Sequence, residues 1–228
     1  MNALIRALTC ATLLGVAGGA HAGIISFDFA TGPGSTQGPH SVTVNGVIAS
    51  AFDNGGAFTP DLLWYRNQTN DHGLGVCNAR VENCGPGDLN ELDNVDSLEV
   101  IILENTNGGK WTSLWVSSLD GNEKGTVFWY NDFAVDFDLN NSFSYTAGVF
   151  AGGVVEGDIL ALPAASAAGF DPTASHLLFI AGDTSFEQGD NDYLIWKGTV
   201  RVPEPGTLGL LGLSMVVAGF ASRRRRAC

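Results

Sequence analysis

Basic residues are scarce in this chain. Between Gly23 and Val202 the sequence has six lysines and arginines against 23 aspartates and glutamates, a formal net charge of about −17. A field of this sign repels nucleic acids and anionic lipid headgroups, which excludes both as partners of this part of the chain. The same negative charge favours solubility outside the cell, and it attracts divalent cations.

Cysteine is also rare. Cys10 lies in the N-terminal segment and Cys228 is the last residue, which leaves Cys77 and Cys84, seven positions apart in "GVCNARVENC". In an oxidising compartment this spacing predicts one local disulfide, worth about 2–3 kcal/mol by the chain-entropy relation. A zinc site would need further ligands at suitable spacing, and the few histidines do not supply them.

The motifs of several enzyme classes are missing. The sequence has no Gly-rich phosphate loop, no G-x-S-x-G elbow and no Cys-x-x-Cys pair. Carboxylates are so abundant that no glycosidase-type pair is singled out. We therefore expect a protein that is not an enzyme, with a secreted hydrolase as the weakest alternative.

The N-terminus has the pattern of a secretory signal peptide over residues 1–22. Arg6 supplies a positive start, an apolar run follows from Ala7 to Val16, and Ala20-His21-Ala22 is a small-x-small cleavage site. The apolar run is too short to cross a bilayer core of about 30 Å. We expect export with removal by signal peptidase, and a folded ectodomain over residues 23–200.

The ectodomain has the pattern of an all-β protein. Short segments rich in Val, Ile, Phe, Tyr and Trp alternate with clusters of Gly, Asn and Asp, which predicts a single jelly-roll-like β-sandwich. Asn45-Gly46 is expected to turn a hairpin, and Leu160–Phe170 to hold a helical turn. His72 is placed on a loop and His176 at a strand edge. The expected strands are Ile24–Ala30, Ser41–Asp53, Leu62–Arg66, Leu98–Glu104, Thr112–Ser118, Thr126–Asn131, Phe143–Ala151, His176–Gly182 and Tyr193–Val202.

Two groups of side chains are candidates for ligand binding. Oxygen ligands crowd the segment before Leu98, and such a loop can hold Ca²⁺, although its spacing is not that of an EF-hand. The competing interpretation is a solvated loop in which Asp93 and Glu99 pair with Arg80 or cap backbone amides. The calcium candidates are Asp88, Glu91, Asp93, Asn94 and Asp96.

Aromatic residues in or beside the strands form the second group. Rings on a sandwich face can stack on sugars, while rings pointing inward fill the core. Neighbours such as Trp129 and Tyr130 must point to opposite faces of a strand, so one of each pair can lie outside the core. The candidates are Trp64, Tyr65, Trp111, Trp115, Trp129, Tyr130 and Trp196.

The C-terminal segment, residues 201–228, has three parts in a fixed order. Pro203-Glu204-Pro205 keeps the chain extended and accessible, because proline blocks both helix and sheet. The apolar run Leu208–Ala221 would span only about 21 Å as a helix, a marginal transmembrane length. Four arginines follow and would hold the cytoplasmic side of such a helix: Arg223, Arg224, Arg225 and Arg226.

This order resembles the PEP-CTERM protein-sorting signal of Gram-negative bacteria, which is also catalogued as an ice-binding protein C-terminal domain. The resemblance implies recognition and removal of the tail by a membrane-embedded exosortase. It implies a transient stay in the inner membrane, followed by delivery to the cell surface or extracellular matrix. It does not make the protein an antifreeze, because the sequence lacks the regular Thr array of an ice-binding face.

Taken together, these features predict a secreted surface protein with a structural or adhesive role in an exopolysaccharide matrix. The first alternative is a carbohydrate-binding module assisted by calcium, and the second is the hydrolase. The expected partners are the exosortase, signal peptidase and exopolysaccharide, and calcium is the one cofactor considered.

Overall fold

A computed structural model describes the chain over residues 23–31, 36–53, 59–68, 71–77, 91–94, 98–119, 121–146, 150, 156–184 and 191–203. Residues Ile24–Arg201 form one compact unit. Just beyond this unit, the Val202 amide donates to the Gly23 carbonyl at 2.9 Å. The expected signal peptide and the apolar C-terminal run lie outside the described residues. Within the described ranges, no helix is long and apolar enough to cross a membrane.

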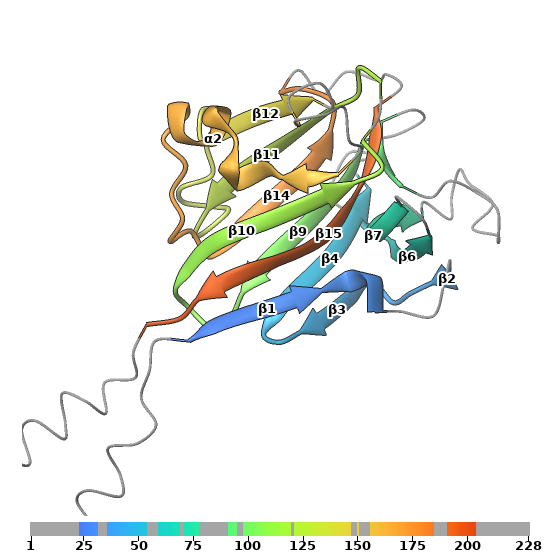
Figure 1. Cartoon of the computed structure of the whole chain (residues 1–228), viewed down its shortest axis with the longest axis horizontal. Helices are drawn as coiled ribbons and strands as arrows, with labels where there is room; N and C mark the ends of the chain where they lie inside the picture. The colour runs from blue at the N-terminus through green and yellow to red at the C-terminus, as the bar shows by residue number, and fades with distance from the viewer. Residues whose placement is uncertain are drawn as a thin grey trace, which may run out of the picture. The chain divides into compact units, whose positions relative to one another are not determined.

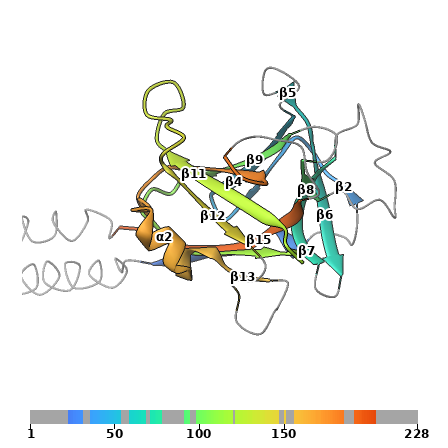
Figure 2. The ribbon, with the colours of Figure 1, turned by 90° about the horizontal axis from the view of Figure 1, so that it is seen from above.

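The compact unit consists of two antiparallel sheets, which confirms the all-β sandwich (Figures 1 and 2). Sheet A has the order β13-β10-β15-β7-β6-β2, and both β1 and β8 also pair with the long β15. Its strands are β1 (Ile24–Asp28), β2 (Thr36–Gln37), β6 (Leu62–Gln68), β7 (Asp71–Cys77), β8 (Leu92–Asp93), β10 (Lys110–Ser117), β13 (Gly157–Asp158) and β15 (Asp192–Arg201).

Sheet B has the order β12-β11-β14-β9-β4-β3, with β5 paired to β4. Figure 2 shows β11, β9 and β4 in one layer and β15 and β13 in the other. The strands of sheet B are β3 (Ser41–Val44), β4 (Val47–Asp53), β5 (Thr59–Pro60), β9 (Glu99–Asn105), β11 (Lys124–Tyr130), β12 (Ser142–Thr146) and β14 (His176–Ala181).

Alternating apolar residues explain why the two sheets pack. In β4, Val47, Ala49 and Ala51 are buried while the residues between them are partly exposed, the pattern expected where one face of a strand meets a core. Across the gap, Tyr145 of sheet B meets Tyr193 of sheet A with ring centroids 5.8 Å apart. The Tyr193 hydroxyl donates to the Ile180 carbonyl at 3.0 Å, so a polar group at the centre of the core is satisfied.

The local signals in the sequence are confirmed where they are strongest. Asn45 and Gly46 have φ of 50° and 77° between β3 and β4, as a two-residue hairpin turn requires. The expected helical turn is present as the 3₁₀ turn Ile159–Ala161 and α2 (Pro163–Ala167). A further 3₁₀ turn, Phe29–Thr31, follows β1.

The placement of His72 on a loop is wrong, because His72 belongs to β7. This strand reads "DHGLGVC", and its two glycines and few β-branched residues hide it from a pattern search. The backbone is nevertheless held by seven paired positions with β6. Tertiary pairing, rather than local propensity, makes this segment a strand.

Candidate functional site

The outer face of sheet B carries a pocket of about 470 Å³. Strand register explains it, because Tyr130 lies opposite His176, and His176 lies opposite Glu104 on the next strand. Ile102 lies two positions before Glu104 on β9 and therefore points to the same face. Ser50 of β4 lies opposite Ile102 and adds a hydroxyl to this face. The lining is completed by Phe52 and by the residues after β11, namely Asn131, Asp132 and Phe133.

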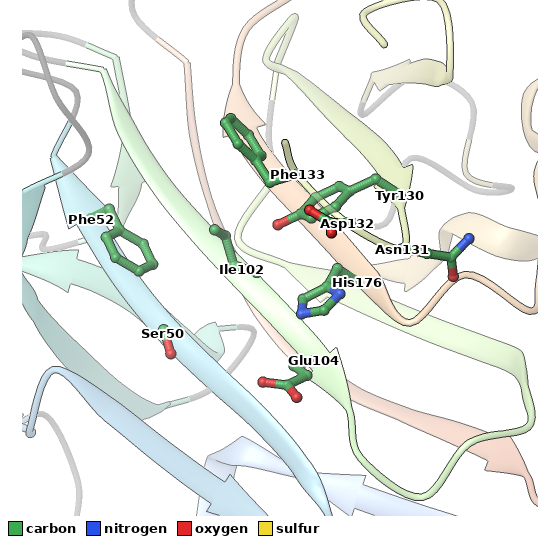
Figure 3. Close-up of a pocket in the computed structure, with 9 residues that line it drawn as sticks. All are labelled: Ser50, Phe52, Ile102, Glu104, Tyr130, Asn131, Asp132, Phe133 and His176. Carbon is green, nitrogen blue, oxygen red and sulfur yellow. The ribbon is translucent and has the colours of Figure 1, made fainter. Parts of the chain in front are cut away.

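Figure 3 shows how these side chains enclose the pocket. Phe52 lies on one side and Tyr130 with Phe133 on the other, and Ile102 and His176 lie between them. The rings of Tyr130 and His176 stack in parallel, with centroids 5.1 Å apart and planes 9° from each other. The pocket therefore has aromatic walls and carboxylates, those of Glu104 and Asp132, at its margin.

Neighbouring phenylalanine rings hold the Tyr130 side chain in place. Tyr130 packs edge-on against both Phe133 and Phe137, at 5.6 Å in each case. Its side chain is nearly buried, and burial together with the charges of Glu104 and Asp136 raises the pKa of Tyr130 to about 12. The hydroxyl therefore stays protonated at neutral pH and can act as a hydrogen-bond donor.

A short loop after β11 holds one side of the pocket. The Asp136 carboxylate accepts hydrogen bonds from the amides of Asn131 and Asp132, at 2.7–3.0 Å. These backbone hydrogen bonds, that of Asp132 first, lower the pKa of Asp136. The same loop exposes apolar side chains, with Phe133 45% and Val135 80% accessible. Such exposed apolar residues beside a pocket are typical of a binding surface.

The calcium candidates do not gather at one point among the described residues. Glu91 is buried and accepts a hydrogen bond from Arg66, and the Asn94 side chain accepts a hydrogen bond from the Asn191 amide at 3.1 Å. Glu99 accepts from the Asp93 amide at 3.1 Å, so it caps a backbone amide, one of the alternatives that the sequence offers. Asp88 and Asp96 lie outside the described residues. In the described ranges, no group of three or more His, Cys, Asp or Glu side chains is arranged to hold a metal ion.

Glu91 instead belongs to a buried polar cluster in sheet A. The Arg66 guanidinium donates to Glu91 Oε1 and, at 2.7 Å, to Asp71 Oδ2. The Ser118 hydroxyl lies 2.8 Å from Glu91 Oε1 and 3.0 Å from Asp71 Oδ1. Burial, and then the hydrogen bond and charge of Asp192, raise the pKa of Glu91 to about 9 despite Arg66 and Ser118. These hydrogen-bond partners account for the burial of the Glu91 carboxyl group, so no bound metal ion is needed to explain it.

The aromatic candidates separate into core and surface groups. Trp64, Trp111 and Trp129 are buried, whereas Tyr65, Trp115 and Trp196 are partly exposed. Trp129 and Tyr130 point to opposite faces, and Tyr130 is the candidate that lines the pocket. The sequence alone does not indicate Glu104, because only the strand register brings it near Tyr130. Asn131, Asp132 and Phe133 directly follow Tyr130 in the sequence, but no pattern marks them as pocket residues.

The predicted disulfide is not tested. Cys77 is buried at the end of β7. Cys84 lies outside the described residues, so the pairing of Cys77 with Cys84 stays a prediction. Of the sorting residues, Pro203 is described and exposed, while Glu204, Pro205 and the four arginines also lie outside the described residues.

Comparison with known proteins gives a match at the C-terminal end of the chain. Residues 201–226 match the family model of the PEP-CTERM protein-sorting motif. No curated protein and no solved structure matches the chain. The motif contains the Pro-Glu-Pro element, the apolar run and the arginines in the order found in the sequence. It implies an exosortase as processing partner, and export with sorting to the bacterial cell surface. The chain thus carries a PEP-CTERM protein-sorting motif, which supports exosortase-dependent sorting to the cell surface.

Proposed function

We propose that this protein is a non-enzymatic, adhesive component of an extracellular polysaccharide matrix, and that its sandwich binds neutral sugars in the pocket of sheet B. The observation that carries the proposal is the stacked pair of Tyr130 and His176 beside the Glu104 carboxylate. Aromatic rings pack on the apolar faces of sugar rings, and carboxylates accept hydrogen bonds from sugar hydroxyls.

The charge of the pocket supports a neutral ligand. Glu104 and Asp132 would repel a sugar that carries a carboxylate or sulfate, but they favour hydroxyl donors. The pocket volume of about 470 Å³ suits one or two sugar units, within the usual range for small-ligand sites of about 300–1,000 Å³. Sorting to the cell surface would bring the pocket to the polysaccharide outside the cell.

A panel of neutral polysaccharides tests this proposal with the purified exported protein. We expect binding to at least one glucan, mannan or galactan, and a loss of affinity of about tenfold or more in Glu104→Gln, because the affected hydrogen bonds involve a charged group. The matched control is Tyr65→Ala, which removes a partly exposed tyrosine from sheet A. Circular dichroism reports whether each variant folds.

The same panel separates the alternatives. Binding that disappears with EDTA would support the calcium-assisted form of the carbohydrate-binding function. Release of free sugars from the panel would favour a hydrolase and contradict a non-enzymatic role. Absence of binding to every neutral polysaccharide would refute the pocket as a sugar site.

A further inference from the structure

The outer face of sheet A has a chemistry opposite to that of the pocket. On β15 the residues Lys197, Thr199 and Arg201 alternate with buried ones and point to this face. Lys110 lies opposite Arg201, and Trp115 lies opposite Lys197 on the neighbouring β10. β10, β15 and β1 run side by side in Figure 1. We call this surface the outer strip; it consists of Lys110, Thr112, Ser113, Trp115, Trp196, Lys197, Thr199 and Arg201.

The outer strip gathers positive charge in an acidic protein. Lys110, Lys197 and Arg201 are three of the six basic residues between Gly23 and Val202. Lys110 and Arg201 are exposed and directly opposite each other. Like charges at directly opposed positions destabilise a sheet, so the fold gains nothing from this arrangement. An anionic ligand bound along the strip would attract both cations and so offset their mutual repulsion.

A bulge shapes the aromatic end of the strip. Lys197 pairs with Trp115 and Ile195 with Val116, which leaves Trp196 as an extra residue. A bulge of this kind re-aims side chains, and here both Trp196 and Lys197 reach Trp115. The indoles of Trp115 and Trp196 meet at 83° with centroids 6.0 Å apart. The Lys197 ammonium lies 3.3 Å from the ring centre of Trp196 and 5.0 Å from that of Trp115.

His72 completes this corner from a third strand. Its ring stacks on Trp196 at 4.9 Å, and its backbone amide donates to the Ser117 hydroxyl at 2.9 Å. The Trp196 Nε1 atom is buried without a hydrogen-bond partner among the described residues. A buried donor without a partner costs stability.

Hydroxyl groups fill the strip between the aromatic end and the outer cations. Thr199 Oγ1 lies 2.8 Å from the hydroxyl oxygens of both Thr112 and Ser113. The strip from Lys197 to Arg201 is about 13 Å long at a rise of about 3.3 Å per residue. Asp28 lies opposite Lys197 on β1, and its carboxylate accepts the Ala30 amide at 2.9 Å.

From these contacts we infer that the outer strip binds an anionic polysaccharide, one whose sugar units carry carboxylates. The Trp115 ring packs on a sugar face, the hydroxyl cluster exchanges hydrogen bonds with sugar hydroxyls, and the three cations pair with carboxylates. This site goes beyond the pocket of sheet B and does not depend on it. Together the two faces would let one molecule bridge neutral and acidic chains of a matrix.

Binding of a short polygalacturonate, compared with two matched probes and with variants, tests the inference on the purified exported protein. We expect saturable binding that weakens as salt is raised, because exposed charges are screened. The fully methyl-esterified form keeps the sugars but loses the charge, and polyglutamate keeps the charge but loses the sugars. Both should bind at least about tenfold more weakly, a difference of about 1.4 kcal/mol.

The variants locate the site. Lys197→Gln and Trp115→Ala should each raise the dissociation constant about tenfold, or about 1.4 kcal/mol. Lys124→Gln removes a cation that lies outside the strip, and Tyr130→Ala removes a pocket wall; both should bind polygalacturonate within about twofold of the unaltered protein. The inference is overturned if polyglutamate or the ester binds equally well, or if Lys197→Gln has no effect in a folded protein. Loss in Tyr130→Ala alone would assign acidic sugars to the pocket instead.

Discussion

At the scale of single residues, the buried Glu91 beside the partly exposed Asp192 has the clearest physical consequence. Glu91 Oε1 accepts from Arg66 and Ser118, while its Oε2 is buried and receives no hydrogen bond from the described residues. The raised pKa, caused by burial and then by Asp192, means that Glu91 keeps its proton at neutral pH. The proton on Oε2 can then be donated to the Asp192 carboxylate, which converts a repulsive contact into a hydrogen bond.

This proton links folding to pH. The pKa of Glu91 is about 9 in the folded protein and 4.5 ordinarily, so the folded state holds a proton that the unfolded chain releases between these values. The contribution to stability is therefore complete below the lower value and is lost progressively as the pH rises toward the higher one. We expect the melting temperature to fall from about pH 5 to about pH 9 more steeply than in Glu91→Gln, whose neutral amide does not titrate.

The control for this experiment is Glu156→Gln, which removes one carboxylate outside the cluster. Its melting temperature should follow the slope of the unaltered protein over the same pH range. Parallel curves for the unaltered protein and Glu91→Gln would show that Glu91 does not carry the pH dependence.

At the scale of the elements, the close approach of β7 to its neighbour β15 depends on one glycine. Gly73 has a φ of 130°, and a Cβ atom there would lie 2.2 Å from the Ile195 carbonyl oxygen and 2.8 Å from the Trp196 Cα. Both neighbours are backbone and cannot move aside cheaply. This close approach lets His72 reach Trp196, so Gly73 supports the aromatic end of the outer strip.

Gly73→Ala should therefore destabilise the protein by about 3 kcal/mol or more, since it combines a backbone clash with a strained φ. Gly108→Ala is the matched control, because it also has a positive φ, of 64°, but a Cβ there meets nothing within 4 Å. Its cost should be about 1–2 kcal/mol, that of the left-handed conformation alone. Urea unfolding of both variants measures the difference, and equal losses would show that the contact with β15 is not tight.

The same elements show what sequence patterns can predict. The Asn45-Gly46 hairpin and strands such as β9 and β14 follow from local residue types, because turn chemistry and β-branched runs act over a few residues. β7 is missed because its pairing partners, rather than its own residues, make it a strand. The bulge at Trp196 is hidden for a similar reason, since it exists only relative to the register of β10.

The candidate sites also combine features that local residue types predict with features that only strand pairing creates. Alternation along β11 predicts that Trp129 and Tyr130 separate, and Tyr130 does line a pocket. It does not predict that Glu104 and Ser50 will stand beside it, because these residues come from strands far apart in the sequence. The acidic segment before Leu98 is equally ambiguous, and the Arg66 partner of Glu91 emerges only from the fold.

At the scale of the whole molecule, charge is divided between surfaces. The pocket of sheet B is lined by the carboxylates of Glu104 and Asp132, whereas the outer strip of sheet A holds Lys110, Lys197 and Arg201. A net charge of −13 for the full chain hides this division. Two faces of different charge favour two different ligands, which is the property required of a protein that bridges matrix polymers.

The C-terminal motif at residues 201–226 supports sorting to the cell surface by an exosortase. Replacing Pro203-Glu204-Pro205 by three alanines removes the extended backbone that two prolines impose. It leaves the apolar run and the arginines intact, so membrane insertion and its direction should be unchanged. We expect the variant to keep its tail and to accumulate in the membrane fraction rather than at the cell surface. Mass spectrometry of the chain and surface labelling of intact cells measure the two effects.

The control for sorting is Arg201→Gln, which lies at the first residue of the matched motif but leaves the Pro-Glu-Pro element unchanged. It should be processed and displayed as the unaltered protein is, while weakening the outer strip by one cation. Processing of the alanine variant at the normal rate would contradict recognition through Pro-Glu-Pro. Normal display of Arg201→Gln together with weaker binding of polygalacturonate would separate the two roles that meet at this end of β15: Arg201 acts in the folded sandwich, and the following residues direct where the sandwich goes.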